Sequence, residues 1–213
     1  PTQERKWIHR FQIIYVPFLY GFMTIYWMSS KDFQQLITYN KQDLLKSQRT
    51  TFNSAITRLI IHKIWYFALA IVAPLILIDL PWWQIMIGFF TMHYVAGMTL
   101  SLVFQSAHVL EETEFFVPNE NLSLENNWAI HQMKTTANFA KKNLPLSWFV
   151  GGLNYQIEHH LFPNICHIHY SKIAKIVKKT AQEYHVPYHE HKTFFAALKS
   201  HFSMLNKLGM GNI

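Results

Sequence analysis

The stretch IWYFALAIVAPLILIDLPWWQIMIGFFTMHYVAGMTLSLVF, residues 64–104, decides the fold of this chain. It contains no Lys or Arg and a single acidic residue, Asp79. As a helix, residues 64–80 have about the minimum length that crosses the hydrocarbon of a bilayer, and residues 82–104 are comfortably long enough. Only one proline separates the two segments, and the pair of tryptophans after it suits the membrane interface. We therefore predict a transmembrane helical hairpin.

The composition of the whole chain fits an integral membrane protein. Half of the 213 residues are apolar and 16% are aromatic, which excludes a disordered chain. The single cysteine excludes a disulfide scaffold. The chain has a net charge of +7, and all 19 of its Lys and Arg residues lie outside residues 64–104. Because they flank both ends of the hairpin, the positive-inside rule places both flanks in the cytoplasm. The same distribution argues against nucleic-acid binding, which needs one basic face with aromatic platforms.

A third apolar stretch, residues 11–28, has two interpretations. Its length allows a span, but Pro17 and Gly21 interrupt it, and its Tyr and Trp residues suit the headgroup region. We favour an interfacial or re-entrant segment and leave a third span open.

Residues 105–213 are soluble in character, and we predict a cytoplasmic helical cap there. Residues 171–184 show an amphipathic helical pattern with Ser171 as the N-cap. Residues 193–208 form a second such pattern, which Gly209 is expected to end. The predicted fold class is all-α: a membrane hairpin and a helical cap that carries a histidine-rich metal site.

Ten of the 13 histidines lie from His108 onward, and the informative group is QIEHH, residues 156–160. On a helix, Gln156, His159 and His160 share one face, because their spacings are three and four residues. Neutral imidazoles suit iron, zinc or copper rather than calcium or magnesium. A histidine pair on a solvated helix would leave the same pattern, so the spacing alone does not decide.

His108 adds a candidate ligand where the second span leaves the membrane. Glu111 and Glu112 follow three and four residues later, so on a continuing helix a carboxylate could orient the ligating imidazole. A solvated helix end is the simpler interpretation of the two acids. For His93, inside the span, a hydrogen bond to a neighbouring helix is the simpler interpretation. Weaker candidates are the pairs His167/His169 and His185/His189.

The stretch GGLNYQIEHHLFP, residues 151–163, strongly resembles the third histidine box of membrane fatty acid desaturases. The continuation NICHIHY, residues 164–170, fits the same family, as does the Phe-Gln-x-x-His arrangement that ends at His108. A glutamine that opens the box, here Gln156, is similar to the front-end acyl desaturases, which insert a double bond between an existing one and the carboxyl end.

This resemblance implies two iron ions, held by histidines from three boxes and by one isolated histidine. His108, His159 and His160 match ligand positions, and Gln156 matches the first position of the box, as a weak ligand or through a water. The family uses O2 as co-substrate and takes electrons from a cytochrome or ferredoxin. Its substrate is an acyl-lipid or acyl-thioester, and its active site faces the cytoplasm from the bacterial plasma membrane or the endoplasmic reticulum.

The first two boxes of the family are expected upstream of Pro1. We therefore expect residues 1–213 to be the C-terminal part of one desaturase domain, inactive by itself. Two alternatives stay open. One is a hydroxylase of the same histidine-rich class, and the other is a non-catalytic membrane protein that binds metal.

Overall fold

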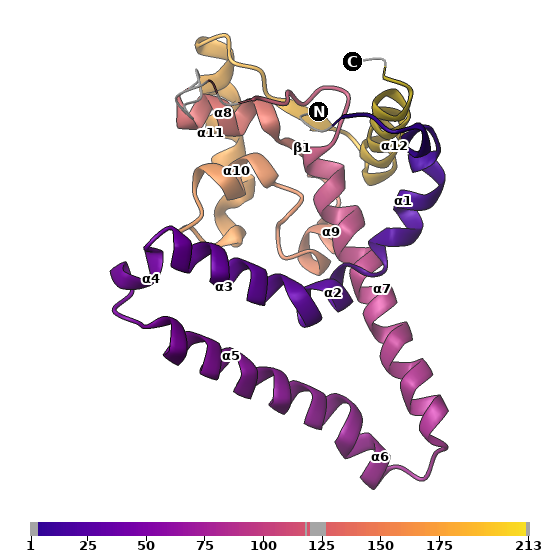
Figure 1. The fold of residues 1–213 in the computed structure, drawn as a ribbon. Helices are drawn as coiled ribbons and strands as arrows, with labels where there is room; N and C mark the ends of the chain where they lie inside the picture. The colour runs from indigo at the N-terminus through magenta and orange to yellow at the C-terminus, as the bar shows by residue number, and fades with distance from the viewer. Residues whose placement is uncertain (1–3, 118, 120–126, 212–213) are drawn as a thin grey trace. The chain divides into compact units, whose positions relative to one another are not determined.

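The computed structural model describes residues 4–117, 119 and 127–211. The chain divides into two compact units, one formed by residues 1–16 with 100–213 (unit 1) and one by residues 17–99 (unit 2). The structure is mostly helical, as predicted, and the membrane hairpin is drawn in purple and magenta in Figure 1.

Two helices are long and apolar enough to cross a membrane. The first runs over Phe52–Leu77 and consists of α5 (Phe52–Phe67), a π-helical turn (Ala68–Val72) and α6 (Ala73–Leu77). The second is α7 (Trp82–His108). The prediction of two spans agrees with this, with the first helix beginning earlier and the second ending later than the predicted segments. Thr51 explains the earlier start, because its side chain accepts a hydrogen bond from Ser54 N and caps α5.

The segment before the hairpin is helical and interrupted. Its turn at Gly21 and Phe22 lies within the predicted interfacial stretch. Counted as one bent span, the segment would give a third crossing, so its place relative to the bilayer stays a prediction. Its elements are a 3-10 helix (Trp7–Phe11), α1 (Gln12–Tyr20), α2 (Met23–Tyr26), a π-helical turn (Trp27–Lys31), α3 (Asp32–Lys41) and α4 (Leu44–Ser47).

Within unit 2, His93 of α7 is held by two neighbouring helices. Its Nε2 lies 2.6 Å from the Tyr66 hydroxyl, and its Nδ1 lies 3.1 Å from Thr24 Oγ1. The simpler interpretation of His93, a hydrogen bond between helices, is therefore confirmed.

Unit 1 holds the remaining elements, five helices and two short strands among its described residues. The helices are α8 (Trp128–Thr135), α9 (Leu144–Phe149), α10 (Gln156–Leu161), α11 (Tyr170–Glu183) and α12 (Phe194–Met210), with a 3-10 turn (His167–His169) before α11. The strands β1 (Ala137–Phe139) and β2 (His189–His191) pair in parallel, with Ala137 opposite His189. This small sheet was not predicted.

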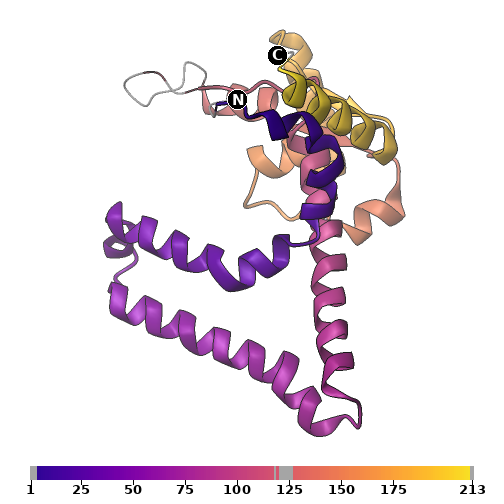
Figure 2. The same ribbon diagram turned by 45° about the vertical axis from the view of Figure 1, so that its right-hand side comes forward.

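Helix α12 lies along the N-terminal segment, as the yellow and indigo ribbons of Figure 2 show. Thr193 caps its start by accepting a hydrogen bond from Ala196 N. The predicted end at Gly209 was wrong: the helix continues to Met210, and Gly211 is the left-handed C-cap residue. Gly209 serves close packing instead, because a Cβ there would lie 2.5 Å from the His9 carbonyl oxygen. The predicted N-cap Ser171 was also wrong, because α11 begins at Tyr170, directly after the 3-10 turn.

Candidate metal centre

The histidine box forms a short helix, α10, behind a glycine turn. Gly151 and Gly152 have φ values of +59° and +76°, a conformation that other residues rarely adopt. The turn is closed by a hydrogen bond from Gly152 N to the Ser147 carbonyl. Burial of Ile157 in a core with Met133 and Val177 then fixes which face of α10 points inward.

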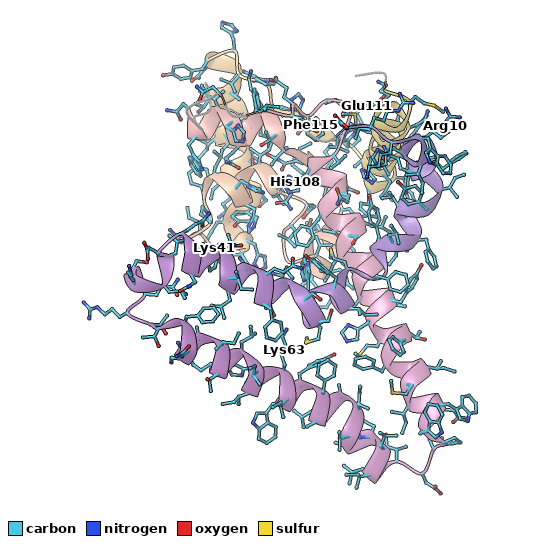
Figure 3. The ribbon with its side chains drawn as sticks, viewed as in Figure 1. Arg10, Lys41, Lys63, His108, Glu111 and Phe115 are labelled. Atoms are coloured by element: carbon cyan, nitrogen blue, oxygen red, sulfur yellow. The ribbon has the colours of Figure 1, made fainter. Side chains whose placement is uncertain are left out.

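The structure brings the three predicted histidines together. His108 is the last residue of α7, and its ring centroid lies 5.1 Å from that of His160 on α10. The rings of His159 and His160 are 5.7 Å apart. His108 and His160 line one cavity of about 420 Å³, whose walls also include Phe116, His131 and Thr135. Figure 3 labels His108 at the end of α7.

The electrostatics of this cluster favour neutral imidazoles. Burial lowers the pKa of His160 to about 4, and the nearby His108 and His159 lower it in the same direction. A neutral imidazole keeps a lone pair for a metal ion, whereas a protonated one repels it. The Nδ1 atom of His159 lies 3.4 Å from the hydroxyl of Tyr170, the first residue of α11. Helix α11 therefore limits how the His159 ring can turn.

Gln156 is almost fully buried, and its Oε1 has no hydrogen-bond partner. Such an orphaned polar atom is costly in a folded protein unless a ligand or water completes it. His131 Nδ1, in the wall of the cavity, is also buried without a partner. Sequence reasoning missed His131, since it stands alone in a segment of α8 with no motif around it.

These side chains fit iron in kind, because imidazole nitrogen and amide oxygen are donors that it accepts. They do not close a site by themselves. Within residues 4–117, 119 and 127–211, no three His, Cys, Asp or Glu side chains are close enough to hold one ion.

The opposite face of α10 carries a buried carboxylate that the sequence analysis overlooked. Glu158 is fully buried and accepts hydrogen bonds from Asn138 Nδ2 at 2.8 Å and from the Tyr188 hydroxyl at 2.9 Å. Asn138 Oδ1 in turn accepts from Ile157 N. Burial raises the pKa of Glu158, while the Asn138 and Tyr188 hydrogen bonds act against that rise. This network attaches the box helix to β1 and to the segment before β2.

Glu111 and Glu112 do not follow His108 on one helical face, because α7 ends at His108. Glu111 Oε1 accepts a hydrogen bond from Ser203, and Glu112 Oε2 accepts one from Ser200, both on α12. Figure 3 shows Glu111 beside that helix. The expectation that they orient a ligating imidazole was therefore wrong in its geometry; the two carboxylates attach α12 to the end of α7.

The weaker histidine candidates lie elsewhere in unit 1. His167 and His169 are exposed in the 3-10 turn, next to the exposed thiol of Cys166. His189 belongs to β2, whereas His185 is in the turn before it, with φ +55°. Neither pair lines the cavity of His108 and His160.

Comparisons with known proteins identify the family of the chain. Residues 2–192 match the family model described as fatty acid desaturase. The chain is 38% identical over 210 residues to the sn-1 linoleoyl-lipid 6-desaturase of Arthrospira platensis. The matched region covers 99% of this chain and 56% of that protein. It is 34% identical to the acyl-lipid (8-3)-desaturase of Physcomitrium patens, over 98% of this chain and 43% of that protein. No solved structure matches the chain.

The chain therefore belongs to the fatty acid desaturase family, an assignment that confirms the resemblance of the box. It spans about half the length of the curated relatives that it matches.

Proposed function

We propose that this chain contributes to a fatty acyl desaturase that uses iron and O2 to introduce a cis double bond into an acyl chain, of the front-end type. The observation that carries the proposal is the convergence of His108 with His159 and His160, from two helices far apart in the sequence. The relatives, named 6- and (8-3)-desaturases of acyl-lipids, support both the reaction and an acyl-lipid substrate over an acyl-thioester.

In this proposal the histidines are some of the ligands to two iron ions, and Gln156 assists them directly or through a water. Iron, when bound, supplies the activation of O2 that removal of hydrogen from an unactivated methylene pair requires. The chain's own residues hold their part of the metal centre. The low pKa of His160 keeps its lone pair available, and the Glu158 network fixes the direction in which α10 presents its histidines.

The reaction needs electrons from outside, and we propose a cytochrome or ferredoxin as donor. Two hydrogens leave the acyl chain as two electrons and two protons, the donor adds two electrons, and the surrounding water supplies two further protons, so that one O2 is reduced to two waters. We propose that the site faces the cytoplasm, in a bacterial plasma membrane or the endoplasmic reticulum. The basic residues on both flanks of the hairpin support that orientation.

The alternatives differ in their products and in their metal content. The test is expression of the chain with the coding sequence that precedes Pro1, followed by analysis of cellular fatty acids and of iron per purified protein. A new double bond and about two irons are expected, both lost in His160→Ala. A hydroxylated acyl chain would identify the hydroxylase instead. Stoichiometric metal in residues 1–213 alone would favour the non-catalytic metal-binding protein.

A further inference from the structure

Helix α9 is apolar on both of its faces. Toward the core, Leu146 and the following Val150 pack against Val103 and Ala107 near the end of α7. Toward the outside, Trp148 has 85% of its surface exposed, and Leu144, Pro145 and Phe149 are exposed beside it. A helix that is apolar all round is typical of a protein interior or of a membrane environment.

The charge pattern around α9 is equally unusual for a water-facing surface. Between Lys142 and Lys172 the sequence holds a single formally charged residue, Glu158, and that side chain is fully buried. Helix α11 of the same unit shows the ordinary pattern, because its exposed positions include Lys172, Lys175 and Lys179. The surface formed by residues 143–171 therefore offers apolar side chains and histidines to its surroundings.

The loop before α11 extends the apolar surface. Ile165 and Ile168 are exposed there, and the loop lies against the turn that follows α9. A Cβ built on Gly152 would come within 2.7 Å of the His167 Cβ, which shows how closely the two segments approach. We call these exposed apolar residues the α9 patch: Leu144, Trp148, Phe149, Ile165 and Ile168.

We propose that the α9 patch inserts into the interfacial zone of the lipid bilayer and anchors unit 1 to the membrane surface. Continuity with the membrane favours lipid as the occupant, because α9 packs directly on the end of α7, one of the two candidate spans. Tryptophan prefers the boundary between headgroups and acyl chains, where an amphipathic ring is partly wet. Exposed apolar side chains gathered on two neighbouring segments are typical of an interaction surface.

The composition of the α9 patch also indicates which interaction would hold it in the bilayer. Because residues 143–171 contain no Lys, Arg, Asp or Glu besides the buried Glu158, insertion depends on burial of apolar area more than on attraction to anionic lipid. The patch should therefore enter a bilayer of phosphatidylcholine alone, and high salt should leave its depth unchanged. Binding through the lysines of α11 would behave in the opposite way.

The test uses the full chain in phosphatidylcholine vesicles, with Cys166→Ser to remove the single cysteine. An environment-sensitive fluorophore is attached to Trp148→Cys, with Phe149→Cys as a second patch position. The matched control is Tyr184→Cys, which replaces an aromatic residue of unit 1 that is 75% exposed at the end of α11. Quenching is measured with lipids that carry a nitroxide near the headgroup and, separately, with iodide in the water.

We expect blue-shifted emission and quenching by the nitroxide lipid at positions 148 and 149, and quenching by iodide at position 184. Equal iodide quenching at all three positions would overturn the proposal. So would shielding of the patch positions from both quenchers, which would indicate a protein partner. Lipid quenching that appears only with anionic lipid, or disappears in high salt, would assign the contact to the lysines and overturn it as well.

Discussion

The two faces of α10 are both buried and polar, yet they differ in how their hydrogen bonds are completed. On one face, Glu158 has two donors, and the groups that donate to it come from β1 and from the segment before β2. On the other, Gln156 Oε1 has no partner, and His160 faces a cavity that His108 shares.

This difference indicates that one face of the six-residue helix α10 stabilises the fold, whereas the other face is available for metal binding. A buried polar group that is fully paired contributes to stability and fixes orientation. A buried polar group that is unpaired costs free energy unless a ligand or a water completes it. We therefore expect substitutions on the two faces to have opposite consequences: stability for Glu158, and metal binding with activity for the Gln156 and His160 face.

The largest expected effect is the loss of activity in His160→Ala. Because changes to residues that only support metal ligands already cost about 10–100-fold, loss of a ligand should lower desaturation by more than about 100-fold. The unfolding free energy should change by less than about 1 kcal/mol, since the ring lines a cavity. Product yield and iron content would be measured beside thermal unfolding in detergent.

The matched control for that experiment is His169→Ala. This histidine is exposed in the 3-10 turn and should leave iron and activity unchanged. Equal losses in both variants would mean that the histidines act without distinction, and would remove the basis for a site at His108 and His160.

On the other face, Glu158→Leu should mainly destabilise the fold. It removes the acceptor of the half-buried Tyr188 hydroxyl and one of the two acceptors of Asn138 Nδ2, which also donates to that hydroxyl at 2.7 Å, at a cost of about 1–3 kcal/mol for a group that stays unpaired. For a chain of this size, a total near 3 kcal/mol lowers Tm by roughly 6–12 °C. Tyr188→Phe should cost less, because Asn138 Nδ2 and Glu158 keep their hydrogen bond to each other when the hydroxyl is removed.

Glu183→Ala provides the control for Glu158. Its carboxylate is exposed and pairs with Lys179 one helical turn away, an interaction worth a few tenths of a kcal/mol, so Tm should hardly move. If Glu158→Leu were as harmless as Glu183→Ala, the buried network would not be what holds α10 in place.

A smaller effect is expected for Gln156→Leu. Because Oε1 has no partner to lose, an apolar side chain of similar size should change the unfolding free energy by less than about 1 kcal/mol. Iron affinity should fall about tenfold or more, as for other groups that assist a metal site. Gln156→His should retain the metal, because the imidazole nitrogen of His is again an atom that can bind iron. A loss of stability with unchanged iron affinity would place Gln156 with Glu158 as a structural residue.

Local sequence was enough to predict the hairpin and the box, and distance along the chain explains what it missed. Gln156, His159 and His160 lie within one helical turn and a half, so their shared face follows from spacing alone. The partners of Glu158 are 20 and 30 residues away, and no local pattern joins them. The same holds for the two three-residue strands, which pair across 52 positions, from Ala137 to His189.

Helix ends were predicted less well, because tertiary contacts override local preference. A glycine near a helix end usually stops the helix, but Gly209 is required by the approach of His9 and the helix continues past it. Glu111 and Glu112 were placed on a continuing helix, whereas α7 ends at His108 and both carboxylates find serines on α12.

The smallest expected effect tests a buried histidine that serves structure alone. His201 on α12 is fully buried, and its Nδ1 lies 2.8 Å from the Val109 carbonyl oxygen, which can only accept, so Nδ1 carries the proton. Burial lowers the pKa of His201 below its ordinary value, against the effect of that hydrogen bond. The unfolded chain therefore takes up a proton first as the pH falls.

It follows that the stability from His201 is fully present above about pH 6.5, the ordinary value for histidine, and declines below it by at most about 1.4 kcal/mol per pH unit. Tm measured from pH 7.5 to 5 should fall more steeply in the wild type than in His201→Gln, which keeps a donor but does not titrate. Iron content at pH 7.5 should be the same in both, in contrast to His160→Ala. Parallel Tm curves for the wild type and His201→Gln would show that His201 titrates alike in the folded and unfolded chain. Loss of iron in His201→Gln would indicate that His201 belongs to the metal site.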